Sequence, residues 1–197
     1  SLLFSIPASL GLILASHEIV NALFGYGSFN EEDIKMTALA LMYFGYGIPA
    51  FALVKIFSNF FFARNNTKTP FYISSLIVLF NIVISVTFFS KIGFIIIPIA
   101  TSLSTWIGVL IYIFLLNIKN YLLLKTYLKK SILKIIFSTI LMSFLLVFAL
   151  DHYSSYLDYT YKFKSVYLIA IVSFVASIYL ISCYLTGVLK KSNFKEY

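Results

Sequence analysis

Charged residues are scarce in this sequence. Of its 197 residues only 11% are charged, whereas 61% are hydrophobic and 19% are aromatic. A water-soluble domain of this length does not have enough interior to bury so large an apolar share. The composition therefore excludes an ordinary soluble domain and predicts a membrane protein.

Residues that support metal, redox or enzyme chemistry are also few. The single cysteine, Cys183, cannot form an intrachain disulfide, and the two histidines are in no metal-ligand pattern with Cys or carboxylates. No paired carboxylates or nucleophile–base spacing are present. The net charge of +8 would suit nucleic acid in a soluble protein, but beside apolar helices it matches anionic lipid better. We expect no enzyme, no cofactor and no nucleic-acid partner.

Six long stretches lack Asp, Glu, Lys and Arg, which favours transmembrane helices. A spanning helix needs about 20 residues, whereas a barrel strand needs only about 10. We predict an all-α membrane protein, a polytopic bundle of six transmembrane helices. The expected spans are about 2–23, 36–60, 70–90, 92–117, 132–150 and 166–189, with a cytoplasmic tail at 190–197. The basic segment 118–131 is interpreted as a cytoplasmic interfacial helix, with a solvated loop as the alternative.

The basic residues are distributed asymmetrically around these spans. Cytoplasmic loops of membrane proteins carry an excess of Lys and Arg, so the three basic segments are placed inside together with the C-terminus. The inner residues are Arg64, Lys68, Lys119, Lys125, Lys129, Lys130, Lys134, Lys190, Lys191 and Lys195, and the outer ones are Lys35, Lys91, Lys162 and Lys164. The chain starts without Met inside an apolar stretch, which predicts the C-terminal part of a longer protein.

Lys55 is the basic residue that this rule does not explain. It lies within the second span, roughly 13 Å along the helix from Arg64. Ionisable groups inside a membrane are costly and are therefore functional candidates. Lys55 is a candidate for attracting an anionic headgroup such as a phosphate in a substrate cavity. Snorkelling, or pairing with a carboxylate elsewhere in the protein, is the alternative.

The same span contains Gly45, Gly47 and Pro49, which are hinge candidates. Glycine and proline weaken the backbone hydrogen bonding of a helix and allow a kink or a close helix contact. Both residues are also common in membrane helices that do not bend.

Near the end of the first span, His17 and Glu18 either relay protons or contact the interface or a partner helix.

Polar side chains on the third and fourth spans form another candidate site. Asn81 and Ser85 are four residues apart and share one helix face, and an antiparallel neighbour brings Thr101 opposite them. Such oxygens suit a hard cation like sodium. Hydrogen bonding between the two helices is the alternative.

Three parts of the sequence resemble the MurJ/MviN lipid II flippases, a family of the multidrug/oligosaccharidyl-lipid/polysaccharide exporter superfamily. Residues 6–12 and 22–29 are similar to its P-x-x-x-G-L and L-F-x-x-G-x-F stretches, residues 43–70 to its G-x-P-A-F, K-I and D-T-K-T-P stretches, and residues 100–104 to its A-T-S-L-S. The family signature loop corresponds to Arg64, Thr67, Lys68, Thr69 and Pro70, with Asn66 in place of the usual Asp. The resemblance runs in order from residue 1 to about residue 117.

The resemblance implies the ninth to fourteenth helices of a fourteen-helix exporter fold, with four second-lobe helices in 1–117 and two C-terminal helices in 132–189. It implies alternating-access transport of lipid II, the undecaprenyl-linked peptidoglycan precursor, from the inner to the outer leaflet of the bacterial cytoplasmic membrane. The implied partners are membrane lipids, lipid II, the N-terminal half of the same protein and cell-wall synthesis proteins. Another exporter of the superfamily, for O-antigen lipids or drugs, and a non-transporting membrane scaffold are the alternatives.

The resemblance also implies one coupling cation, sodium. A sodium site in the family's second lobe would map onto Asn81, Ser85, the carbonyl of Ile97 and Thr101. Ser85 occupies a position where the family can have a carboxylate. The family's main cation-lined cavity residues lie on earlier helices that this chain does not contain, so the chain is not expected to flip lipid alone.

Overall fold

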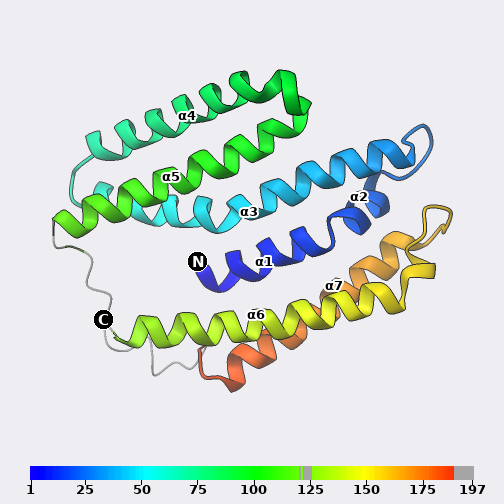
Figure 1. Ribbon diagram of the computed structural model, residues 1–197. Coiled ribbons are helices and arrows are strands. Elements are labelled where there is room, and N and C mark those ends of the chain that lie inside the picture. The colour runs from blue at the N-terminus through cyan, green and yellow to red at the C-terminus, as the bar shows by residue number, and fades with distance from the viewer. Residues whose placement is uncertain (120, 122–125, 189–197) are drawn as a thin grey trace. The chain divides into compact units, whose positions relative to one another are not determined.

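The computed structural model describes residues 1–119, 121 and 126–188, and the regular secondary structure of these residues is helical (Figure 1). Four stretches are long and apolar enough to cross a membrane: Glu31–Phe62, Lys68–Ile118, Ser131–His152 and Lys164–Leu185. The bent pair Leu2–Leu14 and Ser16–Phe24 makes a fifth if it crosses as one broken span. The all-α membrane class is therefore confirmed. The predicted number of six requires that broken span, and it requires counting the two helices within Lys68–Ile118 separately.

The chain divides into two compact units. Unit 1 comprises residues 1–9 and 39–123, and unit 2 comprises residues 10–38 and 124–197. This division differs from the sequence-based boundary near residue 118, because residues 10–38 group with the C-terminal helices. Two helices, α1 (Leu2–Leu14) and α3 (Glu31–Phe62), contribute to both units.

In unit 1, a helical hairpin packs beside the C-terminal part of α3. The hairpin consists of α4 (Lys68–Ile92), a 3₁₀ turn (Gly93–Ile95) and α5 (Ile96–Ile118), and Figure 1 shows α4 and α5 running antiparallel. Gly93 ends α4 with a φ of 74°, a conformation that favours glycine, so the chain reverses there. The core of this unit consists of Phe61, Ile73, Tyr112 and Leu116.

In unit 2, a second hairpin joins α6 (Thr126–His152) to α7 (Lys164–Leu185) through a 3₁₀ turn (Ser154–Tyr156) (Figure 1). The short helix α2 (Ser16–Phe24) packs against α7. Buried side chains of the hairpin include Leu146, Val175 and Cys183, so this part of the unit has its own apolar core.

The structure divides the predicted span 2–23 into two helices. Helices α1 and α2 meet at an angle of 73°. Ala15 leaves the helical conformation with φ −107° and ψ 17°, and the hydroxyl of Ser16 donates to the carbonyl of Ile13 at 3.4 Å. No Gly or Pro marks this position, so the local sequence contains no signal for the break.

Helix α3 starts at Glu31, five residues before the predicted start of its span. The side chain of Asn30 accepts the N–H of Asp33 at 2.9 Å, and the side chain of Asp33 accepts the N–H of Asn30 at 3.1 Å. This reciprocal capping satisfies backbone donors at the first turn, where acidic side chains also complement the helix dipole. The search for uncharged stretches missed this start because the turn is acidic.

The predicted interfacial segment 118–131 lies partly outside the described residues. Residues 120 and 122–125 are not described, and from Thr126 onward the chain belongs to α6. The predicted tail 190–197, with Lys190, Lys191 and Lys195, lies outside the described residues entirely.

Candidate functional site

The hinge candidate Pro49 lies inside a continuous helix and frees one backbone acceptor. Because proline has no N–H, the carbonyl of Gly45, four residues earlier, loses its helical partner. The hydroxyl of Ser9 on α1 donates to that carbonyl at 2.7 Å, and this bond is buried. A neighbouring helix thus satisfies the group that Pro49 leaves unpaired, as membrane interiors require.

Helix α5 contacts the same turn of α3 with two further donors. The hydroxyl of Ser102 donates to the carbonyl of Tyr43 at 2.6 Å, and the indole N–H of Trp106 donates to the carbonyl of Tyr46 at 3.0 Å. Three carbonyls before Pro49 therefore have side-chain partners on other helices. Gly45, Gly47 and Pro49 occupy a turn that is braced from outside α3, and their hinge role stays a prediction.

The signature loop between α3 and α4 is held by two kinds of contact. The guanidinium carbon of Arg64 lies 4.4 Å from the ring centroid of Phe60 and 4.0 Å from that of Tyr121, so the cation lies over two aromatic rings. The side chain of Asn66 accepts the N–H of Thr69 at 3.1 Å and donates to its hydroxyl at 3.0 Å. The carboxylate usual in the family can make the same acceptor contact, so Asn66 preserves this cap of α4.

Lys55 lines an open groove of about 730 Å³ between α3 and α4. Lys68 at the start of α4 lines the same groove. The remaining lining residues are Ser58, Asn59, Phe62, Thr67, Pro70, Phe71, Tyr72 and Ser74. The structure thus brings the membrane-embedded lysine together with three residues of the signature loop, Thr67, Lys68 and Pro70. Two ammonium groups, several neutral polar groups and an aromatic wall meet in this place, which we call the Lys55 groove.

The sodium candidates are joined by hydrogen bonds between α4 and α5. The side-chain amide of Asn81 donates to the hydroxyl of Thr101 at 2.8 Å, and that hydroxyl donates to the carbonyl of Ile97 at 2.8 Å. The hydroxyl oxygen of Ser85 is buried without a hydrogen-bond partner among the described residues. The predicted juxtaposition of Asn81 and Thr101 is present, and interhelical hydrogen bonding accounts for it. Sodium binding stays a prediction.

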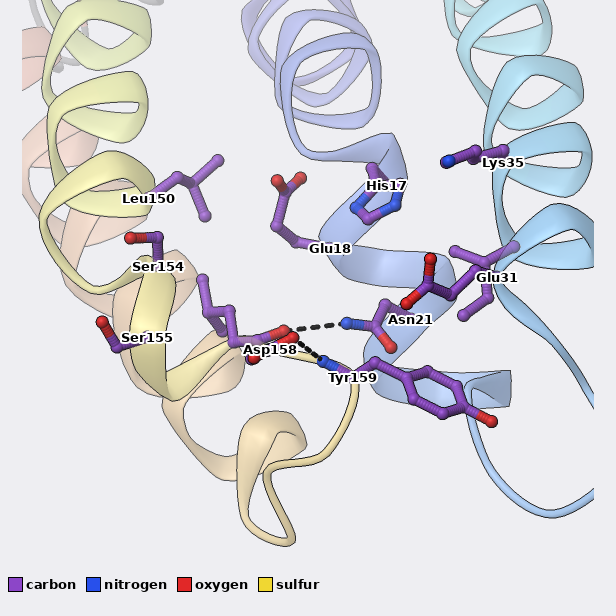
Figure 2. A pocket seen from close by; sticks show the side chains of 12 residues that line it. His17, Glu18, Asn21, Glu31, Lys35, Leu150, Ser154, Ser155, Asp158 and Tyr159 are labelled. Carbon is purple, nitrogen blue, oxygen red and sulfur yellow. Dashed lines mark hydrogen bonds between the residues drawn. The ribbon is translucent and has the colours of Figure 1, made fainter.

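A pocket of about 510 Å³ in unit 2 contains the residues near the α1–α2 break. Figure 2 shows the His17 ring on the side of Lys35 and the Glu18 carboxylate on the side of Leu150. One carboxylate oxygen of Glu18 is buried without a hydrogen-bond partner in the part of the chain that the structure describes. The side chains of His17 and Glu18 point to different walls of this pocket, and their role in proton transfer stays a prediction.

Lys164, which the sequence analysis placed on the outer side of the membrane, is fully buried in the protein. Its ammonium group donates to the side-chain oxygen of Asn21 at 2.9 Å, to the carbonyl of Gly25 at 2.7 Å and to the carbonyl of Tyr159 at 2.9 Å. It also lies 4.4 Å from the ring centroid of Tyr26 and 4.8 Å from that of Tyr159. The burial has a physical reason: three oxygen acceptors and two ring faces replace the water that a buried ammonium group loses.

The neighbouring residue Ser165 extends this contact. Its hydroxyl donates to the carbonyl of Ala22 at 2.7 Å. Carbonyls in the last turn of a helix have no partner within the helix. Lys164 and Ser165, both at the start of α7, therefore cap the C-terminal end of α2, where a cation also complements the helix dipole.

Sequence reasoning missed the residues that act across helices. Ser9, Ser102, Trp106 and Lys164 belong to none of the predicted sites. For Ser9 a weak signal existed, since Pro49 requires some donor for the carbonyl of Gly45. For Lys164 the only signal was its position directly before a long apolar helix.

Comparisons with known proteins agree on one family. The family model described as "MurJ: Lipid II flippase MurJ" matches residues 1–168. The "Probable lipid II flippase MurJ" of Rickettsia prowazekii (strain Madrid E) is 33% identical over 177 residues, which is 89% of this chain and 34% of that protein. The "Lipid II flippase MurJ" of Thermosipho africanus (strain TCF52B) is 32% identical and is covered over 29% of its length by 74% of this chain.

A solved structure, "Lipid II flippase MurJ, inward closed conformation", has a TM-score of 0.73 and 28% sequence identity, covering 93% of this chain and 36% of that one. The chain spans about a third of the length of the curated relatives it matches. The family match continues to residue 168, well beyond the motifs that end near residue 117. On this evidence the chain belongs to the MurJ lipid II flippase family.

Proposed function

We propose that this chain is the C-terminal part of a lipid II flippase of the bacterial inner membrane. The complete protein would move the undecaprenyl-linked peptidoglycan precursor from the inner to the outer leaflet by alternating access. The observation that carries this proposal is the family match over residues 1–168. The relatives reported above are named as flippases, and none of them is named as another exporter or a membrane scaffold.

In this proposal the chain contributes a cation and a movable helix. Lys55 supplies positive charge for the substrate's phosphates from a position within the apolar part of α3. The turn before Pro49 is a place where α3 can bend, because a side chain on α1 and not the helix itself satisfies the carbonyl of Gly45. Side chains on α5 also donate to the carbonyls of Tyr43 and Tyr46. Rearranging those side-chain bonds would let α3 move without leaving polar groups in lipid unpaired.

We expect Lys55→Ala to impair flipping by the complete protein, because it removes the membrane-embedded charge while leaving the helix intact. Lys91→Ala is the matched control, since Lys91 is an exposed lysine in the last turn of α4 and lies outside the groove. The measurement is complementation of a strain depleted of its own flippase. Equal growth with both variants would remove Lys55 from the mechanism.

The orientation proposed here has a cytoplasmic C-terminus, the α3–α4 loop inside and the α2–α3 loop outside. Cysteine introduced at Ser28 should then react with an impermeant maleimide in intact cells, and cysteine introduced at Ala63 should react only after permeabilisation. Both positions are exposed, and they are preferred to Asn30 and Asn66 because those two residues cap α3 and α4. Cys183 is buried and is replaced by Ser in the background protein. The opposite labelling pattern would show that the chain has the inverse orientation in the membrane.

The coupling ion and further partners extend the same proposal. Asn81, Ser85, the carbonyl of Ile97 and Thr101 are the residues proposed to hold sodium. The donor set is four neutral oxygens, and the described residues contain no cluster of His, Cys, Asp or Glu suited to a metal ion. A monovalent cation therefore fits this place better than a transition metal. Cell-wall synthesis proteins are the proposed protein partners.

A further inference from the structure

The Lys55 groove contains a second cation that the proposed function has not used. Lys68 lines the groove together with Lys55, although the two residues come from different helices. None of the lining residues is acidic, so the groove itself supplies no counter-charge for the two ammonium groups. Both lysines are exposed in the described part of the chain. The pair therefore produces a local positive field that an anionic ligand would neutralise.

The position of Lys68 is unfavourable for α4 alone. It lies in the first turn of the helix, where the dipole favours negative charge, and that turn has no acidic residue. An anion placed at this turn would be attracted by Lys68 and by the helix dipole, whereas the backbone N–H of Thr69 is already bound to Asn66 and Pro70 has no N–H. A bound anion would therefore offset the unfavourable charge of Lys68 at this end of α4.

The groove also has an apolar wall beside its charges. Phe62 and Phe71 are exposed large hydrophobic residues that line it, and Tyr72 extends the wall with an aromatic ring. Ser58, Asn59 and Thr67 supply neutral hydrogen-bonding groups between the wall and the lysines. A volume of about 730 Å³ lies in the range of small-ligand sites. A ligand with an anionic head and a hydrocarbon chain matches this combination.

We propose that the Lys55 groove distinguishes a lipid diphosphate from a lipid monophosphate, with Lys68 as the specificity-determining residue. Lys55 takes one phosphate and Lys68 takes the other, while the prenyl chain follows the wall of Phe62, Phe71 and Tyr72. This inference rests on the proposed function, because it assigns part of the flippase substrate to the groove. A headgroup with one phosphate satisfies only one of the two lysines.

Binding to the complete protein in nanodiscs tests this assignment with three related probes. Farnesyl diphosphate and farnesyl monophosphate share one chain and differ by one phosphate, whereas inorganic pyrophosphate has no chain. We expect the wild-type protein to prefer the diphosphate lipid over the monophosphate lipid roughly fivefold, since one charge near a membrane surface contributes about 1 kcal/mol. Inorganic pyrophosphate should bind more weakly than farnesyl diphosphate because it leaves the aromatic wall uncovered.

Lys68→Gln should abolish the preference between the two farnesyl probes, Lys68→Arg should retain most of it, and Lys91→Gln should leave it unchanged. A preference that survives in Lys68→Gln would overturn the proposal. Equal competition by phosphatidylglycerol would show a general site for anionic lipids and would also overturn it. Flipping by the wild-type protein is measured in a separate assay. If the wild-type protein flips lipid but Lys68→Gln keeps the preference, only this inference is refuted. If the wild-type protein does not flip lipid, the proposed function is refuted.

Discussion

Replacing Lys164 with Met is expected to lower the stability of the complete protein by about 3 kcal/mol, because each buried acceptor left unpaired costs about 1–3 kcal/mol. The methionine side chain fills similar space but donates no hydrogen bond. Asn21, Gly25 and Tyr159 would then each keep an oxygen facing the position of the lost ammonium group. The contacts of the cation with the rings of Tyr26 and Tyr159 would disappear as well.

The apparent Tm of the complete protein in detergent measures this effect. Lys162→Met is the matched control, since Lys162 is an exposed lysine two residues away and its loss should move the Tm little. Lys164→Arg should fall between the two variants, because its charge remains while its planar donors fit the three acceptors poorly. If Lys164→Met and Lys162→Met have the same Tm, the buried cation does not stabilise unit 2.

The Lys164 contacts also explain why the units divide as they do. Residues 10–38 belong with the C-terminal helices because the end of α2 receives its missing donors from Lys164 and Ser165 on α7. A helix as short as α2 gains little from its own hydrogen bonds and depends on such tertiary partners. Lys164 and Ser165 thus hold α2 to α7 within unit 2.

The class of the protein could be predicted from sequence because lipid imposes simple rules. Apolar stretches of spanning length fold as helices wherever they occur, so the spans around α3 to α7 followed from composition alone. The helix ends were less certain, because polar capping residues such as Asn30 and Asp33 do not belong to the apolar stretches. The break at Ala15 was missed since no local residue requires it.

The candidate site was predictable only in part, for a related reason. Lys55 was identified because an ionisable residue within an apolar stretch can be recognised from the sequence alone. Lys68 was noted as an inner basic residue and as part of the signature loop, but not as a neighbour of Lys55, because the groove that both line forms only after α4 folds back. Likewise the sequence around Pro49 implies a carbonyl without a helical partner. That Ser9 donates to this carbonyl could not be predicted, because it depends on how α1 packs against α3. Local patterns identify unusual residues, and tertiary packing decides their partners.

The contact between α3 and α5 leads to the second large expected effect, for Gly47→Ala. A Cβ at this position would lie 2.7 Å from the hydroxyl oxygen of Ser102, 2.9 Å from the ring of Phe51 and 3.3 Å from the Cα of Ser102. The Phe51 ring can rotate away. Ser102 cannot move as easily, because its hydroxyl donates to the Tyr43 carbonyl and its Cα belongs to the backbone of α5.

Gly47→Ala should therefore separate α3 from α5 at this turn and destabilise the complete protein by about 1–3 kcal/mol, despite the better helix propensity of alanine. Gly11→Ala is the control, since a Cβ there meets only the terminal methyl of Met142 at an ordinary 3.7 Å. Thermal unfolding in detergent should show a lowered Tm for Gly47→Ala and an unchanged or raised Tm for Gly11→Ala. If both variants gain stability, the two helices do not approach closely at Gly47. The contact by which Ser102 supports the turn before Pro49 would then be contradicted as well.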